Sequence, residues 1–330
     1  MKFLIISRPD LRIRQSAISN PSIGTHLTLD TDDPTQLMSD IKLYIQIAFK
    51  NSSVSSGWYT EGDVEELARL AGGLFVFAAV FAAYILIPSD GRRRSERLRK
   101  LKTYQAESAL APLDTMYSLI LALATDPIVL EPTELVETQR IIAAILSSRM
   151  PLSVKTLADL LSLSPEQLRG ALDELHAVVF VPVQDEEGEL RILHVTFADF
   201  LFTRAPERIR INEAFAHSTL ADACLQRMAD DDLCFNISRS QSLYKPTPSI
   251  KRPWIAHSLC YACMQWAHHV ELAGHKFDDR IDSFLRCKFL FWLETLSVMG
   301  KIGISSKLLH IMASTVCRGK KTSVGLLTPV

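Results

Sequence analysis

The chain has 330 residues, with 36 Lys plus Arg against 37 Asp plus Glu, so no overall charge attracts it to nucleic acid or acidic lipid. With 48% hydrophobic and 22% charged residues, it can build several packed domains, which excludes a largely disordered protein. Its 6 cysteines all lie in the last third without the dense spacing of a secreted disulfide scaffold, so we expect a reducing, cytoplasmic location.

The first segment with a clear pattern is KFLIIS (residues 2–7), a continuous apolar run typical of a strand buried in a parallel sheet. A second short strand is possible at HLTLD (26–30). The apolar run at the N-terminus is too short for a signal peptide, so we expect no export. The first predicted helix is SDIKLYIQIAFK (39–50).

The stretch AGGLFVFAAVFAAYILI (71–87) contains no charged residue. Helical periodicity in the preceding DVEELARL (63–70) predicts one long helix through both segments. As a helix, residues 71–87 would span only about 25 Å, and alanine contributes little to membrane insertion, so a buried core helix is favoured over a membrane span. The basic run that follows (91–102) fits either a cytoplasmic flank or a solvated helix face. The next predicted helix is PLDTMYSLILALA (112–124).

Three helices and a hairpin follow, in the order of a winged-helix domain. The helices are TQRIIAAILSSR (138–149), PLSVKTLADLLS (151–162) and SPEQLRGALDELHAVV (164–179), and the hairpin is VFVPVQDEEGELRILHVTF (179–197). Ser164 and Pro165 are typical of a helix start.

The surface that would read DNA in such a domain is acidic. The third helix carries Glu166, Arg169, Asp173 and Glu174, and the turn carries Asp185, Glu186, Glu187 and Glu189. DNA binding requires cations that neutralise phosphates, so we expect no nucleic-acid partner.

A series of motifs, taken in order, resembles the NACHT-type nucleotide-binding receptors of basidiomycete fungi, which are NLR-like signal-transduction NTPases. The resemblance extends from Phe3 to Gly300 and rests on SRPD (7–10), DIKLYI (40–45), AGGLFVFAA (71–79), LDTMY (113–117), PLSVKTLADLL (151–161), LHAVVFVPV (175–183), HVTFADFL (194–201), YACMQWAHHV (261–270) and FLFWLETLSVMG (289–300).

The resemblance implies five segments. They are the end of a NACHT α/β core (1–30), a helical lid (31–131), a winged-helix domain (132–206), a second helical domain (207–312) and an irregular tail (313–330). The expected fold class is mainly α, with a helical bundle, a winged-helix domain with a short β-hairpin, a second helical domain, and a residual strand of an α/β nucleotide-binding core at the N-terminus.

Two residues carry over as nucleotide-binding positions of intact relatives. Arg8 occupies the place of the sensor-1 arginine near the γ-phosphate, and its structural alternative is a surface arginine. His194 matches the winged-helix histidine that contacts the β-phosphate of ADP, and its alternative is a core histidine at a strand end. The chain departs from related patterns at Val195, where an Asp often follows, and at residues 73–75, where Gly-Leu-Pro often touches adenine.

No G-x-x-x-x-G-K-[ST] phosphate loop is present in the sequence, and the acids of FVPVQDEEG (180–188) belong to the hairpin. Phosphoryl transfer depends on positioning and charge stabilisation, so we expect this chain by itself to be no enzyme and to need no cofactor, whereas intact relatives use ADP or ATP with Mg²⁺. No recognisable nucleophile motif points to another catalytic site.

A zinc site is conceivable at Cys260, Cys263, His268 and His269, but their helical spacing favours buried cysteines. The aromatic residues Phe284, Phe289, Phe291 and Trp292 are expected to form the core of the second helical domain. We therefore expect a partial NACHT receptor with protein partners or self-association. A non-enzymatic interaction module and a membrane-anchored protein are the alternatives.

Overall fold

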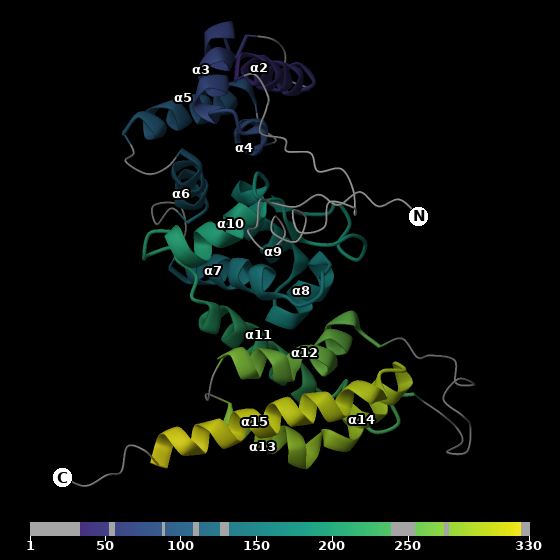
Figure 1. Ribbon diagram of the computed structural model, residues 1–330. Coiled ribbons are helices and arrows are strands. Elements are labelled where there is room, and N and C mark those ends of the chain that lie inside the picture. Colours follow the sequence, from purple (N-terminus) through teal and green to yellow (C-terminus); the bar gives the residue numbers. More distant parts are fainter. Residues whose placement is uncertain are drawn as a thin grey trace, which may run out of the picture.

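The computed structural model describes residues 34–52, 57–87, 90–107, 112–125, 132–238, 255–273 and 277–324. Within these ranges the chain is mainly helical and has one two-stranded antiparallel sheet, which confirms the expected mainly α class. The expected strands at 2–7 and 26–30 lie outside the described residues. Figure 1 shows the helices stacked in three tiers, with helix α6 between the upper and middle ones.

The upper tier is a bundle of four helices, followed by the connecting helix. Their bounds are α2 (Pro34–Lys50), α3 (Glu61–Ala71), α4 (Phe75–Leu86), α5 (Gly91–Glu107) and α6 (Pro112–Ala124). Helix α4 is apolar on all sides and packs against α2, α3, α5 and α6. A helix that is apolar all round must be buried, and Phe81, Tyr84 and Ile85 are fully enclosed. The apolar stretch is therefore a core helix, as favoured from the sequence.

The prediction of one long helix through residues 63–87 was wrong. Gly72 and Gly73 adopt left-handed conformations with φ of 58° and 82°, and they separate α3 from α4. The Gly72 N–H donates to the Arg69 carbonyl as a helix C-cap. This conformation suits glycine because a Cβ atom there would clash with the following carbonyl. No helix in the described part of the chain is long and apolar enough to span a bilayer.

The glycine break gives a testable prediction. Gly73→Ala should lower the free energy of unfolding by about 1–2 kcal/mol, since its φ is unfavourable for alanine and the new Cβ would lie 3.2 Å from Leu37 Cδ2. The measurement is urea denaturation at constant pH. Gly170→Ala is the control, because its Cβ meets nothing within 4 Å and it lies inside a helix, where alanine is preferred. Equal effects of the two substitutions would contradict the role given to the break.

The middle tier contains the expected order of three helices and a hairpin. Its elements are α7 (Pro132–Ser147), α8 (Val154–Leu161), α9 (Pro165–Leu172), the 3₁₀ turn η2 (Asp173–Leu175), β1 (Val179–Phe180), β2 (Arg191–Ile192), α10 (Val195–Asp199) and the π-helical turn η3 (Phe200–Arg204). Ser164 and Gln167 form a reciprocal capping box, which confirms the predicted start of α9.

Two expectations for this tier need correction. The third predicted helix ends at Leu172 and not at Val179, because the chain tightens into η2 and then enters β1. The β-rich runs of residues 179–197 form strands of only two residues each, and the second run is interrupted by α10. An isolated bridge between Leu152 and Leu190 extends the pairing beside the hairpin.

The lower tier is built on the antiparallel packing of two long helices. Its elements are α11 (Glu213–Ala229), α12 (His257–Ala273), α13 (Asp278–Cys287), α14 (Phe289–Val298), η5 (Ile302–Ile304) and α15 (Ser305–Val324). Trp292 donates its indole N–H to the Cys263 carbonyl at 2.9 Å, and its ring lies 6.0 Å from that of Phe284. These two rings are buried, and Phe289 and Phe291 pack beside them, so the aromatic residues form the expected core.

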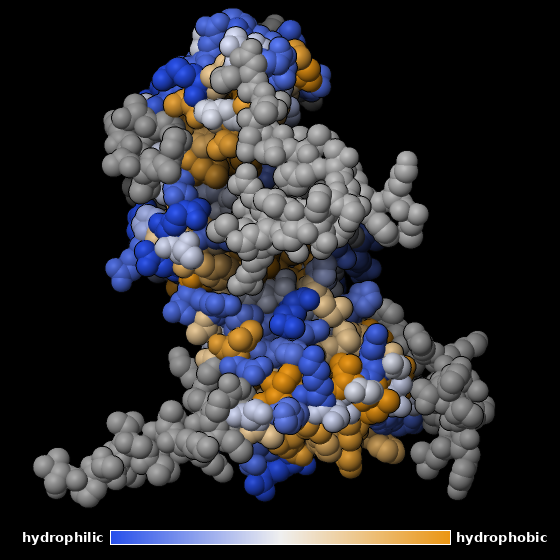
Figure 2. Space-filling model, viewed as in Figure 1, coloured by the Kyte–Doolittle hydropathy of each residue, from blue (hydrophilic) through white to orange (hydrophobic). Residues whose placement is uncertain are grey.

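The expectation of an irregular tail over residues 313–330 was wrong for residues 313–324, because α15 remains helical to Val324, and residues 325–330 lie outside the described residues. On the face shown in Figure 2, apolar side chains gather over the lower tier. The exposed apolar residues of this tier include Leu285, Leu290 and Ile302.

Candidate functional site

His194 lies at the turn from strand β2 into helix α10. Its backbone is extended, with φ of −137°, and its carbonyl accepts the Phe197 N–H at 3.0 Å, which starts the helix. The imidazole is half-buried and has no hydrogen-bond partner within the residues that the structure describes. Burial lowers its pKa, so the ring is neutral at pH 7 and offers one N–H donor and one bare nitrogen.

The residues beside His194 are apolar and exposed. Leu193 is 39% exposed, and Val195 is 59% exposed. On strand β1, the ring of Phe180 lies under the Arg191 guanidinium at 4.7 Å. A neutral imidazole surrounded by solvent-facing apolar side chains is suited to contact with another domain or protein. Single exposed apolar residues, in contrast, are common on protein surfaces.

Helix α6 is fixed to the residues that follow His194. The ring of Tyr117 is buried against Phe197 and Phe200, with centroids 5.0 and 5.5 Å apart, and its hydroxyl lies 2.9 Å from Thr196 Oγ1. The position two residues after His194 therefore contacts α6 directly. We call this set of contacts, together with the one described next, the α6 joint.

A charged pair completes the α6 joint at the other end of the short helix. Arg204, the last residue of η3, donates to Asp114 at 3.0 Å, and the Asp114 side chain is only 13% exposed. Between them, α10 widens into the π-helical turn η3, an irregularity that is frequent at functional sites. The sequence analysis missed this joint. The LDTMY and HVTFADFL motifs contain all of its residues except Arg204, but their long separation in sequence hides the contact.

A third contact links the upper tier to the middle tier. Arg97 of α5 donates to the Ile87 carbonyl at 2.9 Å and lies 3.5 Å from a carboxylate oxygen of Glu174 in η2. Its side chain is 12% exposed, which makes the pair less screened than a surface ion pair. The upper tier is thus fixed to the middle tier through α5 as well as through α6.

The other sequence-predicted residue cannot be placed beside His194. Arg8 lies outside the described residues, as does the whole SRPD motif. Residues 73–75 form the turn into α4, where Leu74 and Phe75 are 53% and 45% exposed. Of the two predicted nucleotide-binding residues, the structure therefore describes only His194.

The single cation of the third helix is used within the domain. Arg169 holds the hairpin turn through Asp185, at 2.6 Å, and through the carbonyls of Pro182 and Val183. The carboxylates of Glu186, Glu187 and Glu189 remain exposed at the turn. This arrangement leaves α9 without a free cation for a phosphate.

The zinc candidate does not form a ligand set. Cys260 and Cys263 both lie on α12, and Cys263 is fully buried, which raises the pKa of its thiol. His269 is enclosed and hydrogen-bonded to His217 and Tyr261, so it does not face the cysteines as a ligand. No group of three candidate ligands gathers within the described ranges.

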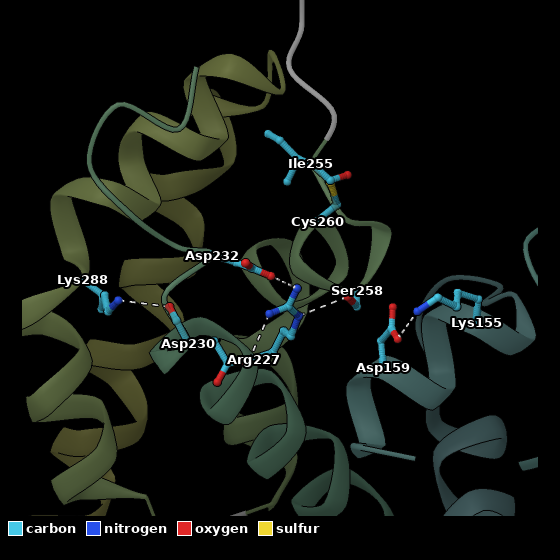
Figure 3. Close-up of polar contacts among 9 residues, drawn as sticks. All are labelled: Lys155, Asp159, Arg227, Asp230, Asp232, Ile255, Ser258, Cys260 and Lys288. Carbon is cyan, nitrogen blue, oxygen red and sulfur yellow. Dashed lines mark hydrogen bonds and ion pairs between the residues drawn. The ribbon is translucent and has the colours of Figure 1, made fainter. Parts of the chain in front are cut away.

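A second polar cluster surrounds Arg227 at the end of α11 (Figure 3). Its guanidinium reaches Asp230, Asp232 and Ser258, and so it ties the loop after α11 to the start of α12. Lys288 donates to the carbonyls of Asp230 and Leu233 in the same loop. The donors of the cluster serve loop carbonyls, carboxylates and the Ser258 hydroxyl, so these contacts stabilise the lower tier.

Comparison with protein-family models, with curated proteins and with solved structures finds no match.

The α6 joint makes a prediction about stability. Tyr117→Phe should lower the free energy of unfolding by about 0.5–1.5 kcal/mol, because it removes the hydroxyl that pairs with Thr196 and leaves the ring packing intact. Urea denaturation measures the loss, and a double-mutant cycle with Thr196→Val assigns it to the pair. Tyr59→Phe is the control, since that hydroxyl has no partner within the described residues. A coupling energy near zero would remove the hydroxyl pair from the joint.

Proposed function

We propose that this chain is the regulatory half of a NACHT-type signalling NTPase, which in an intact relative couples ADP or ATP state to a rearrangement of helical domains in innate-immunity or incompatibility signalling. The observation that carries the proposal is the α6 joint, which connects the upper tier to the residues directly after His194. A change in what contacts His194 would reach the upper tier through Thr196 of α10 and Arg204 of η3.

The order of the middle-tier elements supports this proposal. Three helices, an antiparallel hairpin and the bridge between Leu152 and Leu190 follow one another as in a winged-helix domain. The upper tier then corresponds to the helical lid, and the lower tier corresponds to the second helical domain. The acidic hairpin turn and the internal use of Arg169 argue for a protein-facing role of this domain and not for a nucleic-acid partner.

The residues present do not suffice to hold a nucleotide. His194 offers one hydrogen-bond donor, but the sequence contains no phosphate loop whose backbone amides and lysine would bind the phosphates. We therefore propose that the chain is not an ATPase by itself. Its own residues supply the transmission: His194 contacts the nucleotide-binding part of an intact relative, and Thr196 and Arg204 pass a shift of α10 to α6.

Calorimetry on the purified chain tests the first half of this proposal. We expect neither ADP nor ATP with Mg²⁺ to bind more tightly than about 0.1 mM, because one neutral imidazole cannot replace a phosphate loop. An intact relative that contains the loop is the positive control. In that relative, replacement of the histidine matching His194 by alanine should loosen ADP retention. Saturable micromolar binding by this chain, or unchanged ADP retention in the relative, would contradict the proposal.

A second candidate function is a non-enzymatic protein-interaction module. It is favoured by exposed apolar residues on α2 and at the start of α4, which we call the α2 apolar face: Leu43, Tyr44, Ile47, Leu74 and Phe75. The rings of Tyr44 and Phe75 meet edge to face at 6.2 Å, so residues from the two helices form one continuous surface.

Pull-down with full-length relatives tests the α2 apolar face. Leu43→Glu with Ile47→Glu should reduce capture at least 10-fold, because burying two carboxylates in an interface costs several kcal/mol. Val136→Glu on α7 is the matched control, since Val136 is equally exposed but lies outside this face. If all three substitutions are tolerated equally, the α2 apolar face is not a partner site.

A further inference from the structure

The lower tier contains a buried chain of polar groups that the proposed function does not use. Tyr261 and His269 lie on α12, and His217 lies on α11. The backbone N–H of Arg149, in the link from α7 to α8, donates to the Tyr261 hydroxyl at 3.2 Å. This series of polar groups therefore joins the middle tier to both long helices of the lower tier.

The distances define how protons are shared along this chain. Tyr261 Oη lies 2.9 Å from His269 Nε2, and His269 Nδ1 lies 2.9 Å from His217 Nδ1. Two nitrogens that face each other at this distance can share only one proton, because a hydrogen bond requires one donor and one bare acceptor. The two histidines therefore cannot both be imidazolium ions while the hydrogen bond between them is intact.

Burial makes even the first charge costly. His269 is fully enclosed, and His217 is 6% exposed. Removal from water disfavours a charged imidazole, and burial together with His217 and Arg149 lowers the pKa of His269 to about 3. The pKa of His217 is also lowered by burial, although Glu213 on the same helix opposes this effect.

The charged groups around the pair add little compensation. Arg149 and His268 disfavour a further positive charge, and Glu213 is the acidic group that acts on His217. On the packed neighbours, Lys307 of α15 and Glu271 of α12 act on His268. Charged residues of the packed helices that are paired with opposite charges include Lys155 with Asp159 on α8, Arg140 with Glu137 on α7, Arg280 of α13 with Asp222 of α11, and Arg227 of α11 with Asp230.

We propose that the His217–His269 pair is an acid-sensitive latch between the middle and lower tiers: it holds α11 and α12 to the Arg149 link while at least one imidazole is neutral, and protonation of both releases them. The latch has two states, because the hydrogen bond between the two Nδ1 atoms is either present or broken. Release removes the hydrogen bond that the Arg149 N–H of the α7–α8 link donates to the Tyr261 hydroxyl, so this polar contact between the middle and lower tiers is lost.

The sign of the pH effect follows from the lowered pKa values. The unfolded chain takes up a proton on His269 near the ordinary histidine pKa of 6.5, whereas burial lowers the pKa of His269 in the folded chain to about 3. The stability contributed by neutral His269 is therefore present above about pH 6.5 and is lost as the pH falls from there toward 3, by up to about 10-fold in the folding equilibrium constant per pH unit. The pKa of His217 is lowered as well, so its contribution has the same sign.

Denaturation of the full chain between pH 7.5 and 5 tests the latch. Below pH 6 the wild-type equilibrium constant should fall up to about 10-fold more per pH unit than that of His269→Gln, which keeps a polar side chain but cannot be protonated. His310→Gln, at an exposed position outside the cluster, should keep the wild-type slope. Identical slopes for wild type and His269→Gln would overturn the proposal.

Hydrogen exchange on the unmodified chain supplies a test that needs no variant. After correction for the intrinsic effect of pH, the amides of α11 and α12 should lose about 10-fold protection between pH 7 and 5.5, while α3 and α4 keep theirs. A uniform loss over all helices would show general acid unfolding and overturn the latch. Unchanged protection in α12 would overturn it as well.

Discussion

The burial of Tyr117 between Phe197 and Phe200 is the contact on which the arrangement of the upper and middle tiers depends. A tyrosine ring supplies a large apolar area, and its hydroxyl needs a partner once it is enclosed. Thr196 provides that partner, so the ring can enter the middle tier only in one orientation. Because α6 also packs against α4 and α5, this orientation sets how the upper bundle meets the hairpin side of the middle tier.

The core of the upper bundle explains why α6 can act as a rigid connector. Helix α4 has no polar face, and most of its residues are buried against the helices around it, so packing fixes its position. The left-handed turn at Gly72 and Gly73 lets the chain enter α4 directly from α3. The same turn leaves Leu74 and Phe75 at the surface, next to the exposed side of α2. One local backbone feature thus produces both a buried helix and an apolar surface.

Helix positions were predictable from the sequence where a pattern is local. The capping box at Ser164 and the apolar period of residues 112–124 fixed their helices. The glycine pair was misjudged because glycine is compatible with both a helix interior and a C-cap, and only the tertiary turn decides. The tail was misjudged because helical spacing past residue 313 is weak, although α15 continues there.

Long-range polar contacts were not predictable in the same way. Tyr117 and Thr196 are 79 residues apart, and His217 and His269 are 52 apart, so no periodicity connects them. The candidate site was therefore only partly accessible: the motif pointed to His194, but the joint beside it required the structure. The histidines of α12 drew attention as zinc ligands, whereas one of them is a hydrogen-bonded core residue.

The α6 joint and the His217–His269 latch differ in chemistry, and this difference distinguishes two kinds of control. Burial raises the pKa of Tyr117, so the hydroxyl pair of the α6 joint does not change its charge in mild acid. The His217–His269 pair is the opposite case, because its hydrogen bond is intact only while at least one imidazole is neutral. In the proposed function the α6 joint responds to what contacts His194, whereas in the proposed latch the lower tier responds to the proton concentration. The two proposed controls use different elements of the middle tier, because the α6 joint is made by α10 and η3, whereas the contact to the lower tier is made by the link between α7 and α8.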